Sequence, residues 1–376
     1  MLLARQGRGN VTGQTVEWLE SLSPWPEEFG LGRMRALLTE LGEPQRAFRA
    51  IHVVGTNGKS TATRRAAAFL AREGLSVGAY TSPHVAGWSE RTQVDLEDAD
   101  LESALERVRA PAERRGATQF EVLTAAALAE FAAAEVDVAV VEAGLGGRLD
   151  ATNVLDAEVV ALTNIALDHT DVLGDTREAI AAEKLAVVAP GATVVLGEPE
   201  WASHARAREA GRVINAQDVG RAAAEAILGR PLEGEIETVL AGRFERVGED
   251  VFAGAHNPAG VEWLLERLPR RDYVVVASIL SDKDADAVLQ RLAGAGRVLV
   301  ATASHSARAL PADELARLAQ AHFDTVEMVA DPGNALARGR ELAGDDGAVL
   351  VTGSLYLLAD LIVRLQHVPW DSSASA

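Results

Sequence analysis

The sequence of 376 residues has no cysteine, and lysine supplies only three of its 36 basic residues. The absence of cysteine excludes disulfide bonds, cysteine-ligated zinc and thiol nucleophiles. Acidic residues outnumber basic ones by 55 to 36, and this net charge of −19 argues against holding a nucleic-acid duplex by its phosphates. No apolar run reaches the ~18 residues of a membrane span, and Met1–Gly13 lacks the apolar stretch of a signal peptide. We expect a cytoplasmic protein that binds neither nucleic acid nor membranes.

The scarcity of lysine draws attention to the three that occur, Lys59, Lys184 and Lys283. Because every other basic residue is an arginine, each lysine is a candidate for chemistry that a guanidinium cannot perform. The alternative for any one of them is chance survival on the surface.

The composition indicates a globular chain that buries a large core. Apolar residues make up 48% of it and charged residues 24%. Strand-like apolar segments alternate with helical ones, which predicts an α/β fold with a mainly parallel sheet. In the first part of the chain we expect strands at 50–54, 76–80, 136–141, 158–162 and 193–196, and helices at 60–73, 98–109, 121–134 and 177–188.

The length suggests two domains, and the βα periodicity is interrupted between Arg230 and Arg243 by Pro231, Gly234 and Gly242. We therefore predict domains at residues 1–238 and 239–376. The tail from Val368 is expected to fray. In the second domain we expect strands at 273–277, 297–301 and 348–352, and helices at 284–292, 311–321 and 355–365.

The strongest local motif is Ile51-His-Val-Val-Gly-Thr-Asn-Gly-Lys-Ser-Thr61, between a predicted strand and a predicted helix. Gly55 and Gly58 permit a tight turn whose N–H groups point at phosphate oxygens, and Lys59 would neutralise the β- and γ-phosphates. A hydroxyl of Ser60 or Thr61 would bind Mg²⁺. The strict Walker pattern fails because Val53 stands where it requires glycine, and an ordinary glycine-rich turn is the alternative.

Three further residues suggest a metal site. Glu142 closes an apolar strand, and a carboxylate at the carboxyl end of a parallel strand points into the binding crevice, although a solvated acid is the alternative. His169 follows the next strand and is either a ligand or a structural residue. Lys184 lies among alanines and valines and is either a surface lysine or a buried one whose amine becomes reactive.

These motifs, taken in order, resemble folylpolyglutamate synthase/dihydrofolate synthase, a family of the Mur ligase superfamily, over nearly the whole chain. The stretch Glu142-Ala-Gly-Leu-Gly-Gly-Arg-Leu-Asp-Ala-Thr-Asn153 is the most family-specific match. The other matching segments are Phe29–Arg33, Leu41–Gln45, Gly55–Lys59, Thr81–His84, Ala166–Asp171, Gly254–Pro258, Asp282–Asp284 and Gly353–Leu355.

The resemblance implies a P-loop ATP-binding domain followed by a smaller Rossmann-like α/β domain that binds glutamate. It implies that ATP is held by Gly55, Thr56, Asn57, Gly58, Lys59, Ser60 and Thr61, with Asn215 and Arg243. Two Mg²⁺ sites would be formed by Ser82, Glu142, His169 and Lys184, the last as a carbamate. Thr118, Gln119, Phe120, Glu121, Leu149, Asp150 and Ala151 would line the pteroate site. His256 and Ser354 would serve from the second domain, and the catalytic residues would be Lys59, Lys184, His169 and His256.

Three departures from the family pattern stand out. Ser60 follows Lys59 where the family usually has glycine. The stretch from Gly197 to Asn215 is short, which weakens the match at Asn215. Ala253 replaces an aspartate that contacts the nucleotide in the family, and Asp250 would compensate only after a shift of the loop.

The resemblance implies an ATP-dependent ligase, acting as a monomer on small molecules. It would join L-glutamate to dihydropteroate, to the γ-carboxylate of folates, or to both, through an acyl phosphate, and release ADP and phosphate. A peptidoglycan-type Mur ligase is one alternative, although only ~50 residues precede the loop, too few for an N-terminal UDP-binding domain. A non-catalytic nucleotide-binding relative is the other, and Ala253 makes it thinkable.

Overall fold

The computed structural model describes residues 13–26, 28–238 and 240–365, and the chain divides into two compact units. The first unit contains residues 1–83 and 88–238, and the second contains residues 84–87 and 239–376. The tail from Val368 and nearly all of Met1–Gly13 lie outside the described residues.

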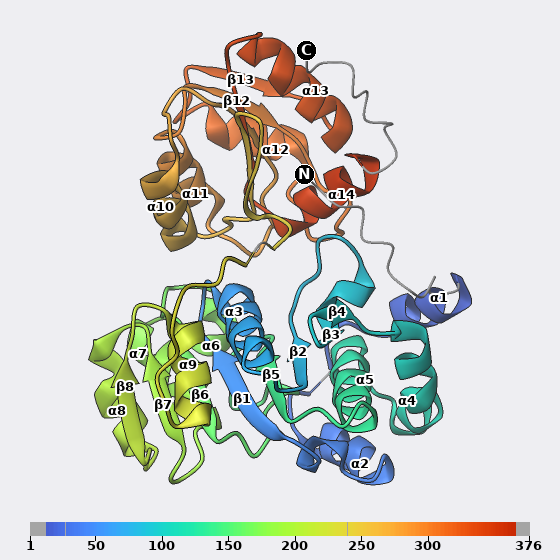
Figure 1. The fold of residues 1–376 in the computed structure, drawn as a ribbon. Helices are drawn as coiled ribbons and strands as arrows, with labels where there is room; N and C mark the ends of the chain where they lie inside the picture. Colours follow the sequence, from blue (N-terminus) through green and yellow to red (C-terminus); the bar gives the residue numbers. More distant parts are fainter. Residues whose placement is uncertain (1–12, 27, 239, 366–376) are drawn as a thin grey trace, which may run out of the picture. The chain divides into compact units, whose positions relative to one another are not determined.

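An eight-stranded sheet forms the centre of the first unit, in the order β4-β3-β2-β5-β1-β6-β7-β8 (Figure 1). All pairs from β2 to β8 are parallel, whereas β2–β3 and β3–β4 are antiparallel. The strands are β1 Arg49–Val54, β2 Val77–Tyr80, β3 Thr92–Val94, β4 Glu97–Asp98, β5 Val138–Glu142, β6 Val159–Leu162, β7 Thr193–Leu196 and β8 Arg212–Asn215. The α-helices are α1 Gly13–Ser21, α2 Gly32–Glu40, α3 Lys59–Arg72, α4 Leu101–Arg115, α5 Gln119–Ala133, α6 Thr170–Leu173, α7 Arg177–Lys184, α8 Ala202–Ala207 and α9 Val219–Leu228.

Helices cover both faces of this sheet, so its central strands are apolar on both sides. Helices α3 and α9 pack on one face, together with Ile51 and Val53 of β1. On the other face α4 and α5 cover β2 and β5, while α7 and α8 cover β6 and β7 together with Ala50 and Val54 of β1. The carboxyl ends of β1, β5 and β6 therefore meet at one edge, where ligands bind in open α/β sheets.

The second unit contains a six-stranded sheet in the order β13-β12-β11-β14-β10-β9, in which the β9–β10 pair is antiparallel and the others are parallel. Its strands are β9 Arg243–Val247, β10 Asp250–Ala253, β11 Val274–Ala277, β12 Val298–Ala301, β13 Thr325–Met328 and β14 Val349–Thr352. Its helices are α10 Pro258–Arg267, α11 Ala285–Leu292, α12 Ala312–Ala319, α13 Pro332–Ala343 and α14 Leu355–Leu365. The predicted α/β class, with one large mainly parallel sheet and one smaller sheet, is confirmed.

Helix α4 differs from its prediction, which placed it at 98–109. It begins after Asp100, whose carboxylate accepts a hydrogen bond from Ser103 N at 3.2 Å, and it continues past Pro111 to Arg115. Gly116, with φ of +60°, ends it in the left-handed conformation that terminates many helices. The capping residues, rather than the internal proline, set its limits.

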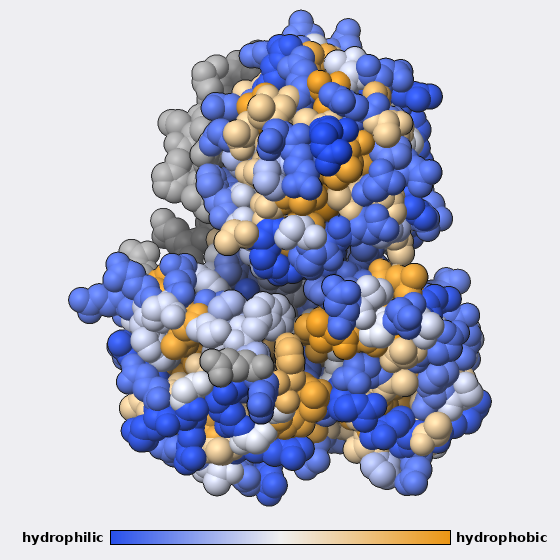
Figure 2. Space-filling view, turned by 180° about the vertical axis from the view of Figure 1, so that it is seen from behind, coloured by the Kyte–Doolittle hydropathy of each residue, from blue (hydrophilic) through white to orange (hydrophobic). Residues whose placement is uncertain are grey.

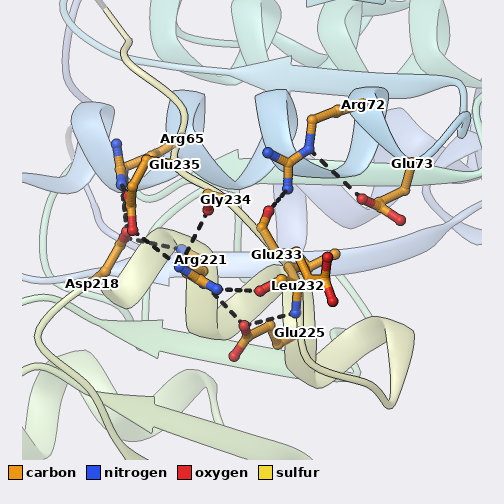
Figure 3. Close-up of polar contacts among 10 residues, drawn as sticks. All are labelled: Arg65, Arg72, Glu73, Asp218, Arg221, Glu225, Leu232, Glu233, Gly234 and Glu235. Atoms are coloured by element: carbon orange, nitrogen blue, oxygen red, sulfur yellow. Dashed lines mark hydrogen bonds and ion pairs between the residues drawn. The ribbon is translucent and has the colours of Figure 1, made fainter.

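Three arginines fix the segment through which the chain leaves the first unit (Figure 3). Arg221 donates to the carbonyls of Leu232 and Gly234, Arg72 donates to Glu233 O, and Arg65 pairs with Glu235. All three guanidinium groups lie 5.0–5.7 Å from the ring of Phe69 on α3. The segment 232–236 is thereby held on the helix that begins at the phosphate loop.

The surface drawn in Figure 2 is mainly hydrophilic, with apolar side chains in small groups. Among the described residues, no helix combines the length and hydropathy that a membrane span requires.

Candidate active site

Two glycines shape the loop between β1 and α3. Gly55 has a φ of +146°, and a Cβ on it would lie 1.9 Å from Thr163 Oγ1. Gly58 has a φ of +80° and is the N-cap of α3. Both values lie in the left-handed region that side chains disfavour, so the loop conformation requires glycine at both positions.

A segment after β6 braces this loop through Asn164. Asn164 O accepts from Thr56 N at 2.9 Å, and its side-chain oxygen accepts from Asn57 N at 3.0 Å. Its amide nitrogen donates to Asn57 O at 3.2 Å, and Thr163 Oγ1 donates to the same carbonyl at 2.7 Å. The N–H groups of Thr56 and Asn57 are therefore bonded within the protein and support the loop. Sequence reasoning missed Asn164, although an amide directly after a buried strand was a usable signal.

The start of α3 carries the predicted phosphate-binding side chains. Lys59 is its first residue, and its Nζ donates to Thr56 O at 3.3 Å, so the ammonium lies over the loop. Ser60 is buried and Thr61 half-buried. The first N–H groups of a helix have no intrahelical acceptor, and the helix dipole favours an anion there.

Glu142 lies beside this loop at the end of β5, which pairs with β1. It is 2% exposed, and its two oxygens accept from Ser60 Oγ at 3.2 Å and from Ser82 N at 3.1 Å. A buried carboxylate bonded to a phosphate-loop hydroxyl is a donor pair that suits Mg²⁺, which binds proteins through one or two carboxylates and takes its other ligands from phosphates and water. These residues fit a nucleotide-bound metal.

Lys184, the last residue of α7, is 5% exposed. Burial, together with the smaller effect of the positive charge of Lys59, lowers the pKa of its amine to about 7. The carboxylates of Asp168, Asp150 and Glu183 act in the opposite direction. Of the two alternatives for this lysine, the structure shows the buried one. A large fraction of the amine is therefore neutral near pH 7, as carbamate formation requires.

His169 is the N-cap of α6 and has the left-handed conformation, with φ of +51°. Its Nε2 lies 3.9 Å from Asp168 Oδ1, and its backbone N–H donates to the same oxygen at 3.0 Å. No group of three or more His, Asp or Glu side chains within the described ranges could hold a metal.

The family-specific loop 144–153 folds around the carboxylate of Asp150. Asp150 accepts from Leu145 N at 2.7 Å and from Thr152 N at 3.0 Å. Burial raises its pKa, while these bonds and the charge of Lys59 lower it. A Cβ on Gly147 would lie 2.6 Å from Lys184 O, so this loop packs directly on the end of α7.

The other predicted pteroate residues lie at the start of α5. Thr118 and Glu121 form a capping box, in which Thr118 N donates to Glu121 Oε2 at 2.8 Å. Arg33 Nε donates to the same oxygen at 2.7 Å, an interaction that sequence reasoning missed. A Cβ on Gly144 would lie 2.5 Å from the ring of Phe120, so α5 contacts the Asp150 loop. Gln119 anchors the helix start to Leu19 O at 3.0 Å.

Within the same loop, Leu149 is 43% exposed, whereas Ala151 is buried in the core beneath α5. Asn215 is exposed at the end of β8, and β6 and β7 separate that strand from β1. The structure thus brings most of the predicted residues of the first unit to one edge of the sheet, and it places Asn215 at the far end of that edge.

Three predicted residues belong to the second unit. Arg243 begins β9 and pairs with Ala253 of β10. His256 Nδ1 lies 2.9 Å from Gly254 O. Ser354 is buried after β14, and its hydroxyl accepts from Tyr356 N at 3.1 Å.

The structure does not support the idea that Asp250 replaces the aspartate that the family has at the position of Ala253. Asp250 lies at the start of β10, where its carboxylate accepts from Arg340 Nε at 3.1 Å and from Val349 N at 2.8 Å. Moving it to the other end of the strand would break both interactions. Ala253 itself is buried in the apolar core of its unit.

Comparison with known proteins places both units in one family. Residues 53–230 match the Mur ligase middle domain, and residues 242–355 match the glutamate ligase domain of Mur ligases. A dihydrofolate synthase/folylpolyglutamate synthase from Escherichia coli K12 is 32% identical over 321 residues, which are 72% of this chain and 76% of the relative.

Solved structures agree with this assignment. A folylpolyglutamate synthase from Mycobacterium tuberculosis in complex with ADP has a TM-score of 0.86 at 29% identity, covering 94% of this chain and 98% of that one. A bifunctional folylpolyglutamate synthase/dihydrofolate synthase with manganese, AMPPNP and L-glutamate bound has a TM-score of 0.81 at 28% identity, covering 93% of this chain and 97% of that one.

Proposed function

Since the chain belongs to the Mur ligases, and among them to the dihydrofolate synthases/folylpolyglutamate synthases, we propose how its residues join L-glutamate to a pteroate or folate carboxylate at the expense of ATP. The chain is an ATP-dependent glutamate ligase of this type. The relatives that match most of this chain are dihydrofolate or folylpolyglutamate synthases. Their similarity favours this activity over that of a peptidoglycan-type ligase.

One observation carries the assignment of the catalytic edge. The buried carboxylate of Glu142 accepts from Ser60 Oγ and Ser82 N directly beside the glycine loop that ends in Lys59. This arrangement supplies a cation for the phosphates and oxygen ligands for a divalent metal in one place. We assign ATP phosphates to residues 58–61 and Mg²⁺ to Glu142, Ser60 and Ser82.

The reaction needs two bond exchanges. The substrate carboxylate attacks the γ-phosphorus of ATP, the bond to ADP breaks, and an acyl phosphate forms. The neutral amine of glutamate then attacks the acyl carbon, phosphate leaves, and the amine loses a proton as the amide forms. Lys59 offsets the phosphate charge, and a bound divalent cation supplies further neutralisation.

Lys184 is proposed as the ligand that completes a second metal site. As an ammonium it would repel a cation, whereas a carbamate would present two oxygens bearing a negative charge. Asp168 acts electrostatically on this lysine, and the next residue, His169, is the N-cap of α6. Of the first-unit residues, Leu149, Asp150 and Phe120 are assigned to the pteroate side.

The second unit is assigned to the glutamate, with His256 and Ser354 as contacts and Arg243 as a nucleotide contact. Two Mg²⁺ per active site, a monomeric state and a cytoplasmic location remain predictions from the sequence.

Release of ADP, measured with and without L-glutamate and with and without dihydropteroate or a reduced folate, tests the function. We expect ADP release only when both co-substrates are present. Release that is independent of any pteroate compound would contradict the assignment.

A further inference from the structure

A buried histidine links the strand before the phosphate loop to the loop proposed to hold pteroate. His52 lies on β1 and is 1% exposed. Its face of the strand is shared with Ala50 and Val54, which belong to the apolar core under α7. Its Nε2 lies 2.8 Å from Thr152 Oγ1. A polar ring in such surroundings needs a partner, and Thr152 provides it.

The chemistry of the three side chains fixes the direction of these hydrogen bonds. Asp150 Oδ1 accepts from both Thr152 N and Thr152 Oγ1. A hydroxyl has one hydrogen, so Thr152 Oγ1 can bond His52 only as an acceptor. His52 must therefore carry its proton on Nε2. Burial lowers the pKa of His52 to about 4, so the ring is neutral at physiological pH.

This relay holds the middle of the loop 144–153. Asp150 accepts hydrogen bonds from three backbone N–H groups of this loop. Leu145 N and Thr152 N donate to its carboxylate, and Asn153 N donates to its carbonyl at 2.8 Å. His52 connects that closure to β1, three residues before Gly55. The relay lies next to Ala151, which is buried in the core beneath α5.

We propose that His52 is a positioning residue for the pteroate carboxylate: through Thr152 it holds residues 149–151 in a fixed place relative to the phosphate loop. The proposal rests on the assignment of Leu149 and Asp150 to the pteroate side. His52 supports the loop that is proposed to hold pteroate, and it does not support the residues that are proposed to hold the phosphates. Its loss therefore weakens the binding of pteroate more than the binding of ATP.

Matched substitutions test this role. His52→Met fills the space without a donor, whereas His52→Gln retains an N–H of similar reach. Thr152→Val breaks the relay at its centre, and Thr152→Ser keeps the hydroxyl. We expect His52→Met and Thr152→Val to raise the KM for dihydropteroate about tenfold, the equivalent of one neutral hydrogen bond, and to leave the KM for ATP within about twofold. His52→Gln and Thr152→Ser should recover most of the loss.

The combination of His52→Met with Thr152→Val should be no worse than either alone, because both break one relay. Equal losses in the KM for ATP and for dihydropteroate would show a general structural role and overturn the proposal. So would a normal KM for dihydropteroate in the Thr152→Val enzyme.

A second measurement uses the unmodified protein and needs no activity. Nitrogen-15 NMR of histidine-labelled protein should show His52 as the neutral Nε2–H tautomer from about pH 5.5 to pH 8. An Nδ1–H tautomer would refute the relay even if the variants fail to fold. If the wild-type protein shows no pteroate-dependent ADP release, the proposed function is wrong. The tautomer of His52 still tests the hydrogen-bond relay independently of that result.

Discussion

The buried amine of Lys184 offers the sharpest test of the catalytic assignment. With its pKa near 7, about half of the amine is neutral at pH 7, compared with roughly 0.03% for a lysine at the ordinary value of 10.5. Burial therefore raises the neutral form on the order of a thousandfold. Reaction of that amine with CO₂ gives a carbamate and a proton, which turns a cation into a metal ligand.

The expected outcome is loss of ligation in both Lys184→Ala and Lys184→Arg, since neither side chain can form a carbamate. Short carboxylic acids should restore part of the activity of Lys184→Ala by occupying the vacated ligand position. With ¹³C-labelled bicarbonate, wild-type protein should show a carbamate resonance in the NMR spectrum. Lys283→Arg is the matched control, because Lys283 is also buried but lies 3.6 Å from Asp282. It should keep the resonance.

The same lysine predicts how stability varies with pH in CO₂-free buffer. The folded pKa of Lys184 lies below the unfolded one, so between pH 7 and 10.5 the unfolded chain binds more protons and stability rises with pH. Below pH 7 both states are protonated, and the buried cation costs on the order of 5 kcal/mol. Lys184→Met should therefore be more stable than wild type at pH 6, by a margin that shrinks above pH 7.

Urea unfolding at pH 6 and pH 9.5 measures this margin. An unchanged margin across that range would show that the lysine is not a buried cation in the folded protein. An active Lys184→Arg enzyme without a carbamate resonance would refute the metal-ligand role.

Three further substitutions test the phosphate loop. Glu142→Gln keeps the size of the side chain but removes its charge, so kcat should fall about a hundredfold or more while the melting temperature stays close to that of wild type, as ADP release and calorimetry would show. Gly55→Ala should cost more than ~3 kcal/mol in urea unfolding, because its Cβ would collide with Thr163 Oγ1; a cost below 1 kcal/mol would contradict the loop geometry. Asn164→Ala removes two side-chain hydrogen bonds to Asn57, so the KM for ATP should rise about tenfold, and an unaltered KM would show that the brace is dispensable.

The parts of the fold that the sequence predicted well are those where one face or both faces of an element are buried. Strands such as β5 are buried throughout, and β7 was predicted at its observed limits, Thr193–Leu196. The elements missed include three helices of ten or more residues, α9, α10 and α13, as well as several short or edge strands. Strand β8 is largely exposed, and β3 and β4 contain three and two residues, so neither alternation nor an apolar run marks them.

The residues of the candidate site also divide into those that the sequence predicted and those that it did not. Lys59 and Glu142 were predictable because each terminates or begins a regular element at the carboxyl edge of the sheet. The partners Arg33 and His52 were not, because their roles depend on contacts between segments far apart in the chain, and for Asn164 the only signal was its position after a buried strand. Arg33 bonds Glu121, His52 bonds Thr152, and Asn164 bonds Asn57. No local pattern encodes such a pairing.

The structure shows what surrounds two of the residues that depart from the family pattern, Ser60 and Ala253. Ser60, where the family usually has glycine, donates its hydroxyl to Glu142 at 3.2 Å, so the replacement adds a bond at the proposed metal site. Ala253 is different, because its side chain lies among apolar residues in the core of the second unit. An aspartate at that position would need a partner for a buried charge, and Asp250 is held at the opposite end of β10 by Arg340. The first departure thus adds a hydrogen bond beside the phosphate loop, whereas the second places an apolar side chain in the apolar core of the second unit.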